Sequence, residues 1–581
     1  MARTTYLAPG VYVEEVPSAQ QPIAGVGTNT AAFIGIVPDT IYYPVPNEDY
    51  DPVAAQAALE LTALTARKAQ LSSKEKPDAE TVADVDNAIA TSTRALQATI
   101  RRLDRNITLA QQELDKASDD AKPGIQARID DLQKEKAMVQ ARLTPAEPAG
   151  KPDAGPKDNP GAASSAEKEE TFEETIQDEA ALLQKDPLKP YVMARFDVKV
   201  DACDAKLCTN FTEYTNRFGP FSAYKLSPEP GETNPAKWRF RPLHPGHSAL
   251  TNAVNGFFTN GGTRVFVVRI KAVDTLEEDL KRALEELESI EEVALIAAPG
   301  LPKTLEVWEA LSTWCDAREN TFAILDSPGV VNDGKDEDLD IEQLVPGDSM
   351  KALPHFSKSA AYYFPHPEVT DPAKQLQDAD PVRQVGLKYR GRTYVAPSGH
   401  IAGIYARTDE ERGVHKAPAN CPVRGALDVK YYIGKAKQEL LNPHGVNCIR
   451  SLNGDIVVWG ARTIGGDSNA EWKYVNVRRL FLFLRESIDK GTQWAVFEPN
   501  DYALWGKIRL NVSAFLTTVW RSGALFGLTP EEAFYVKCDS ETNPPEERDL
   551  GKVVTEIGVA IVRPAEFVIF RVTQSTGMQK A

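Results

Sequence analysis

Uninterrupted apolar runs that alternate with amphipathic segments mark the start of the chain and most of its second half. Residues 31–37 (AAFIGIV) are apolar throughout, which is typical of a strand buried on both faces of a sheet. The same patterns predict strands at 264–270, 293–298, 321–326 and 360–365, and helices at 275–290, with Thr275 as its N-cap, and 305–318. Strands that alternate with helices predict a helix-covered sheet with parallel crossovers.

The last third is predicted to contain two long helices followed by three strands. The helices span about 473–490 and 501–526, and the strands 533–538, 553–562 and 566–574. Lys507 and Arg521 lie within about 40° of each other on the second helix, opposite its apolar stripe. That stripe consists of Leu504, Ile508, Val512, Phe515 and Val519.

Residues 53–144 differ in composition and are rich in Ala, Leu, Gln, Lys, Arg and Glu. Apolar residues recur there at helical spacing, and Pro77 and Pro123-Gly124 interrupt the pattern. Two or three helices packed as an antiparallel hairpin are expected, and a self-packed insertion is favoured over a coiled coil that binds a partner. The proline-rich residues 145–170 predict a linker, with a short acidic helix at about 171–185.

Charge and cysteine content exclude several classes of protein. The 581 residues contain 66 Lys and Arg against 83 Asp and Glu, a net charge of −17 that argues against a protein that coats nucleic acid. No apolar run reaches the roughly 18 residues of a membrane helix, and the first residues do not resemble a secretory signal. Six cysteines are few for this length and fit a reducing cytoplasm.

Two candidate metal sites are weak. Cys203 and Cys208, with His244 and His247, could supply four zinc ligands, but they lack the tight paired spacing of structural zinc sites. An acidic cluster around Asp338 lacks the glycine and distal glutamate of a calcium loop. The sequence therefore predicts no metal site.

Residues 329–336 (GVVNDGKD) have the Gly and Gly-Lys spacing of a phosphate-binding loop. Asp336 stands where that loop needs Ser or Thr, and acidic residues follow immediately and would repel phosphate. A solvated acidic loop is favoured, although a nucleotide-binding enzyme that uses Gly329 to Lys335 remains an alternative. No catalytic signature or cofactor motif is recognised, so no enzyme activity is expected.

A series of segments with a distinctive composition occurs in order along the chain. They are 9–15 (PGVYVEE), 253–262 (AVNGFFTNGG), 395–403 (VAPSGHIAG), Asp409, 412–420 (RGVHKAPAN), 459–463 (WGART), 474–479 (YVNVRR), 497–500 (FEPN), 523–527 (GALFG) and 563–567 (RPAEF). In these segments the chain resembles the contractile tail sheath proteins of phage tails, R-type pyocins and related injection systems. The resemblance covers about residues 6–40 and 205–578 and omits the helical segment.

The resemblance implies a multi-domain sheath subunit of mixed α/β class with a helix-covered sheet core, terminal β-arms and an inserted helical segment. The expected divisions are 1–40, an N-terminal arm and first strand; 50–190, the insertion and linker; 191–395, the middle domains; 396–565, a C-terminal assembly domain; and 566–581, a C-terminal arm. Such a subunit polymerises as stacked hexameric rings around an inner tube and contracts.

The implied partners are further copies of the chain, an inner tube protein, and baseplate and tail-terminator or cap proteins, with no nucleic acid and no direct membrane insertion. Assembly in the cytoplasm is expected. An adhesin that binds through the 53–144 helices is the remaining alternative.

The candidate site residues are two arms and one helix face. Exchange of terminal strands between subunits would hold neighbours together through main-chain hydrogen bonds while the bodies swivel. The arm residues are Val11, Tyr12, Val13, Glu14 and Glu15 at one end, and Phe567, Val568, Ile569, Phe570, Arg571 and Val572 at the other. Lys507 and Arg521 are the candidate contacts with the inner tube.

Overall fold

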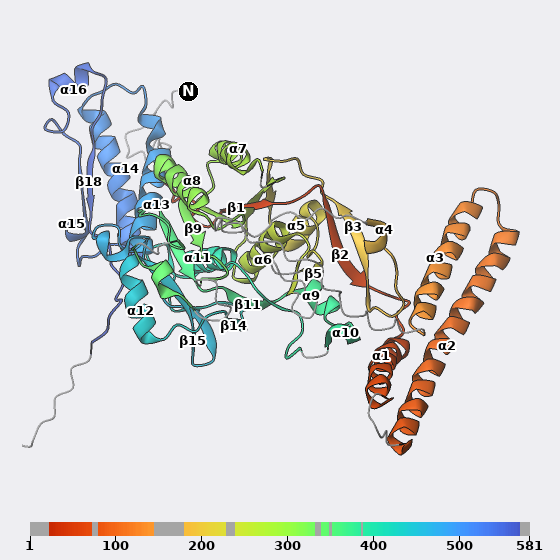
Figure 1. The fold of residues 1–581 in the computed structure, drawn as a ribbon. Coiled ribbons are helices and arrows are strands. Elements are labelled where there is room, and N and C mark those ends of the chain that lie inside the picture. Colours follow the sequence, from red (N-terminus) through yellow and green to blue (C-terminus); the bar gives the residue numbers. More distant parts are fainter. Residues whose placement is uncertain are drawn as a thin grey trace, which may run out of the picture.

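The computed structural model describes residues 23–72, 79–143, 179–227, 239–272, 274–331, 339–347, 351–384 and 387–569. A long helical projection lies at one end of the molecule, a helix-covered sheet occupies the middle, and a second group of helices lies at the other end (Figure 1). Among the described helices, none combines the length and apolar composition needed to cross a membrane.

The middle of the molecule is built on a nine-stranded sheet whose order is β13-β16-β15-β10-β9-β8-β1-β7-β4. Its inner strands, from β7 to β15 in that order, are parallel, and the outer strands are antiparallel. The strands are β1 (Ala31–Ile36), β4 (Ala205–Cys208), β7 (Val265–Ile270), β8 (Leu295–Gly300), β9 (Phe322–Asp326), β10 (Ala360–Phe364), β13 (Cys421–Pro422), β15 (Val446–Leu452) and β16 (Asp455–Val458).

Helices cover both faces of this sheet, as the alternating pattern predicts. Helices α6 (Pro245–Thr259) and α11 (Ser398–Arg412) pack on one face, and α7 (Leu276–Glu288) and α8 (Leu305–Arg318) on the other. Successive residues of β1 enter opposite layers: Phe33 faces α6 and Ile34 faces α7 and α8. Full burial on both sides explains the uninterrupted apolar runs.

Glycines allow α11 to lie against the backbone of α6. A Cβ atom at Gly399 would stand 2.2 Å from the carbonyl oxygen of Ala253, and one at Gly403 would stand 2.4 Å from that of Phe257. Any side chain at either position would force the two helices apart. This contact gives a physical reason for the 395–403 segment.

Thr275 precedes α7 as its N-cap residue, as expected, but its side chain has another partner. Thr275 occupies the N-cap position, but its hydroxyl makes no capping bond to the backbone. It donates instead to the carboxylate of Asp279, at 2.7 Å. The acidic first turn thus competes with the backbone for the threonine hydroxyl.

The helical projection contains α1 (Pro52–Ser72), α2 (Ala79–Lys116) and α3 (Lys122–Ala141). These helices share a small core that includes Leu61, Leu96 and Val139, so they pack on one another as expected. The expected break at Pro123-Gly124 falls inside α3, because proline is tolerated in the first turn of a helix. Of the predicted helix at 171–185, α4 (Glu179–Leu182) is described.

The second group of helices consists mainly of α13 (Val475–Thr492) and α14 (Tyr502–Arg521), which share a core with the hairpin β17 (Phe534–Lys537) and β18 (Glu556–Val559). Asp501 caps α14 by accepting from the N–H of Leu504 at 2.8 Å. The predicted strand at 566–574 is not formed over residues 566–569, and its remainder lies outside the described residues.

Short elements complete the fold. Strand β2 (Thr40–Pro46) pairs with β3 (Tyr191–Asp197), and β5 (Tyr224–Ser227) pairs with β6 (Arg239–Pro242). The remaining elements are β11 (Pro367–Thr370), β12 (Arg392–Tyr394), β14 (Asp428–Val429), α5 (Phe211–Phe218), α9 (Pro372–Gln377), α10 (Pro381–Gln384), α12 (Lys435–Leu441), α15 (Pro530–Ala533) and α16 (Pro545–Asp549).

Candidate assembly site

Helix α13 joins the two halves of the body. Its Val475 and Leu482 belong to the core beneath the central sheet, whereas Leu480 and Leu484 belong to the core shared with α14. Residue 23 lies against this helix, and Glu566 contacts Tyr474, the residue that directly precedes it. We call residues 23–30 the N-terminal root and residues 563–566 the C-terminal root.

The N-terminal root lies along α13. Ile23 is buried in the core of α13 and α14, and the backbone N–H of Val26 donates to the hydroxyl of Ser487 at 3.2 Å. A Cβ atom at Gly25 would stand 2.9 Å from the ring of Phe483, so the root can approach the helix closely. Residues near the start of the chain thereby become part of the C-terminal core.

A buried ion pair fixes the end of the N-terminal root. Arg479 of α13 donates to both carboxylate oxygens of Asp409 on α11, at 2.9 and 2.6 Å, and to the carbonyl oxygen of Thr28 at 2.9 Å. The hydroxyl of Thr28 donates to the same carboxylate at 2.6 Å. The side chains of Arg479 and Asp409 are only 4% and 5% exposed, so the pair is largely withdrawn from solvent.

A second arginine pair fixes the C-terminal root. Arg462 is 3% exposed and donates to both carboxylate oxygens of Glu566, each at 2.8 Å. Asn442 and the hydroxyl of Tyr474 donate to the same carboxylate, at 2.9 and 3.0 Å. Burial alone would raise the pKa of Glu566, but these hydrogen bonds and the charge of Arg462 hold that pKa below its usual value.

The chain becomes exposed immediately after this anchor. Phe567, Val568 and Ile569 are 70%, 69% and 78% exposed, although all three are large and apolar. The described tail leads away from the body in Figure 1. Three consecutive exposed apolar residues on a single chain suggest a surface that is covered in an assembly.

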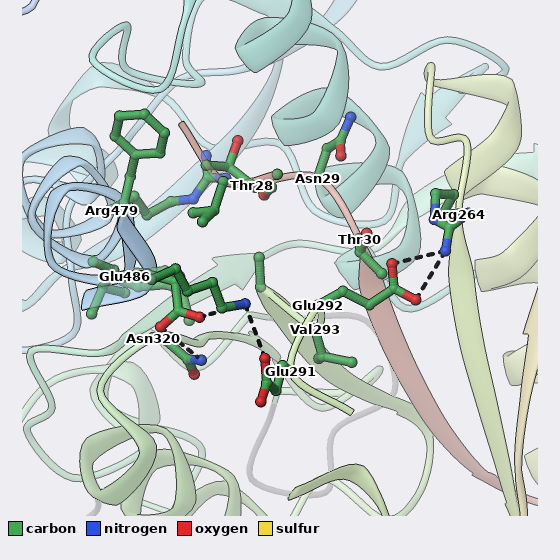
Figure 2. A pocket seen from close by; sticks show the side chains of 17 residues that line it. Thr28, Asn29, Thr30, Arg264, Glu291, Glu292, Val293, Asn320, Arg479 and Glu486 are labelled. Carbon is green, nitrogen blue, oxygen red and sulfur yellow. Dashed lines mark hydrogen bonds and ion pairs between the residues drawn. The ribbon is translucent and has the colours of Figure 1, made fainter. Parts of the chain in front are cut away.

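A cleft of about 350 Å³ borders the N-terminal root. Figure 2 shows Arg264 paired with Glu292, and Glu291 and Glu486 near each other. Lys490 bridges Glu291 and Glu486. The carboxylates are thus matched by cations within the wall. These ion pairs connect α13 and the residue before β7 to the loop before β8.

Helix α14 presents a cationic outer face. All five residues of its predicted apolar stripe are buried, and Lys507 and Arg521 are exposed as the pattern indicates. The helix contains no acidic residue between Tyr502 and Arg521, and Leu510 on the same outer face is 62% exposed.

Two family models match the region that contains α11, α13, α14 and the C-terminal root. The model described as phage tail sheath protein central domain matches residues 276–464, and that described as phage tail sheath C-terminal domain matches residues 467–575. Asp409 and Arg462 lie in the first match, and Arg479 and Glu566 in the second. The chain belongs to the contractile tail sheath family.

Curated sheath proteins are similar over part of the chain. The tail sheath protein of Vibrio phage KVP40 is 28% identical over 188 residues, which cover 32% of this chain and 26% of that protein. A putative prophage major tail sheath protein of Pseudomonas aeruginosa strain UCBPP-PA14 is 28% identical over 207 residues, which cover 34% and 51%. The matched region thus spans about a quarter of the first sheath protein and about half of the second.

Solved structures of contractile systems share the fold. A chain of the six-fold symmetrised anti-feeding prophage baseplate is 28% identical, with a TM-score of 0.50 and coverage of 65% of this chain and 91% of that one. A chain of the contracted PVC sheath complex, from an extracellular contractile injection system, is 24% identical, with a TM-score of 0.50 and coverage of 73% and 99%. These likenesses confirm the mixed α/β, multi-domain sheath fold.

The candidate arm residues of the sheath chain are only partly described. Val11, Tyr12, Val13, Glu14 and Glu15 lie outside the described residues, as do Phe570, Arg571 and Val572. The structure places Ile23 in the core of α13 and α14, and Glu566 beside Tyr474, the residue before α13. Exchange of the arms between subunits therefore stays a prediction.

The sequence analysis did not assign the four anchoring residues of the sheath chain. Arg462, Arg479, Asp409 and Glu566 all stand within or beside segments that carry the resemblance, but nothing in their spacing pairs them. A usable signal was present: Arg462 and Arg479 are charged residues in neighbourhoods that are otherwise buried. A buried arginine is commonly balanced by a carboxylate from elsewhere in the fold.

The structure describes the contacts of two candidate zinc ligands, Cys203 and His247. Cys203 contacts Asp279 of α7, and Nε2 of His247 lies 3.0 Å from the carbonyl oxygen of Phe218. Burial lowers the pKa of His247 to about 3. Among the described residues, no three His, Cys, Asp or Glu side chains gather as metal ligands would. Lys335, Asp336 and Asp338 lie outside the described residues.

Proposed function

We propose that this chain is the structural subunit of a contractile sheath. It polymerises as stacked hexameric rings around an inner tube and shortens to drive that tube through a target envelope. The observation that carries the proposal is the pair of roots. Each terminal segment is fixed to the body by a buried arginine, Arg479 of α13 at one end and Arg462 after β16 at the other, and the C-terminal segment then continues as exposed apolar chain. Family membership and fold support it.

The work of such a sheath is stored in the assembly rather than supplied by an active site. Subunits must change their relative orientation without separating, which requires a contact that is continuous and yet able to swivel. A terminal strand added to a neighbour's sheet meets this requirement, because its main-chain hydrogen bonds persist while the segment before it turns. The root must then hold firm, and buried bidentate pairs do this better than surface pairs.

The outer face of α14 is proposed to rest on the inner tube. Lys507 and Arg521 would meet acidic side chains there through exposed, salt-screened contacts. A weak contact is suitable because the sheath must slide along the tube when it contracts. Baseplate and terminator proteins are the proposed partners at the two ends, and assembly is proposed to take place in the cytoplasm.

The decisive experiment is expression of the full chain alone, followed by negative-stain microscopy and sedimentation. Hollow tubes in the contracted form are expected, because no inner tube is present to hold the extended form. A chain that ends after Glu566 keeps its anchor and should stay folded by circular dichroism but no longer assemble. Removal of residues 1–22 should produce the same defect, and a stable monomer of the full chain at high concentration would contradict the proposal.

A further inference from the structure

A cationic cavity lies at the end of α11, against the outermost strand of the central sheet. It has a volume of about 420 Å³, and its wall includes residues from α11, from the loop after it and from β13. Four of its side chains are cations and one is an acid: Arg407, Arg412, Lys416 and Arg424 against Glu411. Such an excess of positive charge is unusual on a chain whose net charge is −17.

Arg407 is the buried member of this group. The residue is 7% exposed, and its Nη2 donates to the carbonyl oxygen of Pro422 at 3.0 Å. Its Nη1 is buried, and no described residue accepts a hydrogen bond from it. A buried guanidinium N–H without an acceptor is unfavourable, and such atoms are usually satisfied by a partner.

The charged groups around Arg407 are mostly cations. Burial lowers the pKa of Arg407, and the nearby charge of Arg424 lowers it further, against weaker opposing effects of Cys421 and Glu411. Lys416 is held in place by the carbonyl oxygens of Ala417 and Ala419. Arg412 and Arg424 are exposed at the rim, and the structure gives neither an ion pair with a described residue.

We propose that this cavity binds an oxyanion, a carboxylate or phosphate group that accepts from Nη1 of Arg407 and is surrounded by Arg412, Lys416 and Arg424. Guanidinium groups match the planar oxygens of such anions, and the volume accommodates a small polyanion or one or two acidic side chains. The source of the oxyanion is either a free ion or an acidic side chain of a second copy of this chain.

Cys421 provides a local probe of the cavity. It lines the wall and is the most exposed of the six cysteines. A thiol reagent applied to the folded full-length chain should therefore modify Cys421 first. The anionic reagent 5,5′-dithiobis(2-nitrobenzoate) should be attracted by the cations, whereas neutral iodoacetamide should not.

The experiment measures both modification rates with and without inorganic pyrophosphate at constant ionic strength. Pyrophosphate should slow modification of Cys421 by about ten-fold at saturation. The double variant Arg412→Ser, Arg424→Ser should lose this protection and react more slowly with the anionic reagent alone. The matched control Arg142→Ser removes an exposed arginine of the helical projection and should behave as the unaltered chain.

Sedimentation in the same pyrophosphate series separates the two sources. Protection together with weakened self-association assigns the oxyanion to a second copy, and protection with unchanged association assigns it to a free ion. Absence of protection, or equal protection in the double variant with unchanged circular dichroism, would overturn the proposal.

Discussion

Arg462 and Arg479 are buried cations, and each connects segments that are far apart in the sequence. Each uses the planar fork of arginine to hold both oxygens of one carboxylate and a backbone carbonyl at the same time. A lysine could supply the charge but not this geometry. Removing either partner of such a pair leaves a buried charge uncompensated, which typically costs about 3–5 kcal/mol.

Glu566→Gln should loosen the C-terminal root while the body stays folded. Glutamine keeps the shape but loses one of the two carboxylate charges that Arg462 pairs with, the other being the more exposed Asp467. Backbone amides near residue 566 should therefore exchange hydrogen faster, and assembly should weaken. Hydrogen exchange read by mass spectrometry, beside sedimentation, measures both effects. Glu546→Gln changes an exposed carboxylate on α16 and serves as the control.

The same anchor predicts a pH dependence. Because the pKa of Glu566 is lowered in the folded chain, its stabilising effect is present above the unfolded pKa of about 4.3 and is lost as the pH falls through the folded value. The unaltered chain should therefore lose protection at the root in acid. Glu566→Gln should lack this change, and an identical acid response in both chains would contradict the role of the anchor.

Glu135 on α3 is a carboxylate in an unfavourable place. It is 4% exposed, and burial with nearby Asp49, Asp131 and Asp186 raises its pKa to about 7, against the opposing charge of Lys185. A raised pKa means that the stability contributed by this group is greatest below the unfolded pKa of about 4.3, falls as the pH rises from there to about 7, and stays low above that. Glu135→Gln should therefore stabilise the chain at pH 8 by up to about 3 kcal/mol and change little at pH 5.

Thermal unfolding followed by circular dichroism at the two pH values tests this expectation. Glu113→Gln alters an exposed carboxylate on α2 and is the matched control. Equal effects of Glu135→Gln at pH 5 and pH 8 would show that the carboxylate is not strained in the folded chain.

At the scale of elements, α14 separates two roles on opposite faces. Its apolar stripe stabilises the C-terminal core, while the exposed cations contribute little to folding. A substitution of the outer face can therefore test partner binding without unfolding the chain.

The double reversal Lys507→Glu, Arg521→Glu should weaken assembly on the inner tube and leave contracted tubes of this chain alone unchanged. The defect should be largest at low salt, where screening is weakest. Co-assembly with the inner tube protein, counted by electron microscopy, measures it. Arg101→Glu, Arg105→Glu on α2 makes the same change in net charge; normal extended particles from the α14 variant would place the tube contact elsewhere.

At the scale of the whole molecule, the inserted segment leaves and rejoins the body at the hairpin of β2 and β3, and α1 also contacts α10. Strands β2 and β3 pair in register up to Pro46 and Tyr191, and the N–H of Asn47 donates to the carbonyl oxygen of Pro190 at 3.0 Å. The two ends of the inserted segment therefore meet. The α1, α2 and α3 helices have their own core and lie at the end of the molecule opposite α14 (Figure 1).

Replacing residues 48–189 by a two-residue Asn-Gly turn should leave the rest of the chain folded. Such a turn suits a β-hairpin, and the central sheet takes no strand from the removed segment. Tubes should still assemble, with a smaller outer diameter in negative stain. A shortened chain that folds by circular dichroism but forms no tubes would assign the projection a role in assembly.

The strands and helices of the body could be read from the sequence because burial on both faces leaves long apolar runs. Predicted limits agree with the structure within a few residues at β1, β7, α8 and α14. Strands from both sides of the predicted domain division at residue 395 belong to the same nine-stranded sheet. Strand order depends on long-range pairing, which local patterns do not encode.

The sequence by itself determined the fold class, the family, the helical insertion and the apolar character of the C-terminal arm. These follow from local periodicity and from ordered segments that resemble sheath proteins. Only the tertiary structure decided that Arg462 meets Glu566, that Arg479 joins Asp409 to the N-terminal root, and that Arg407 lies buried in a cationic cavity. Such pairings join residues dozens to hundreds of positions apart, and the free energy that selects them arises only when folding removes those charges from water.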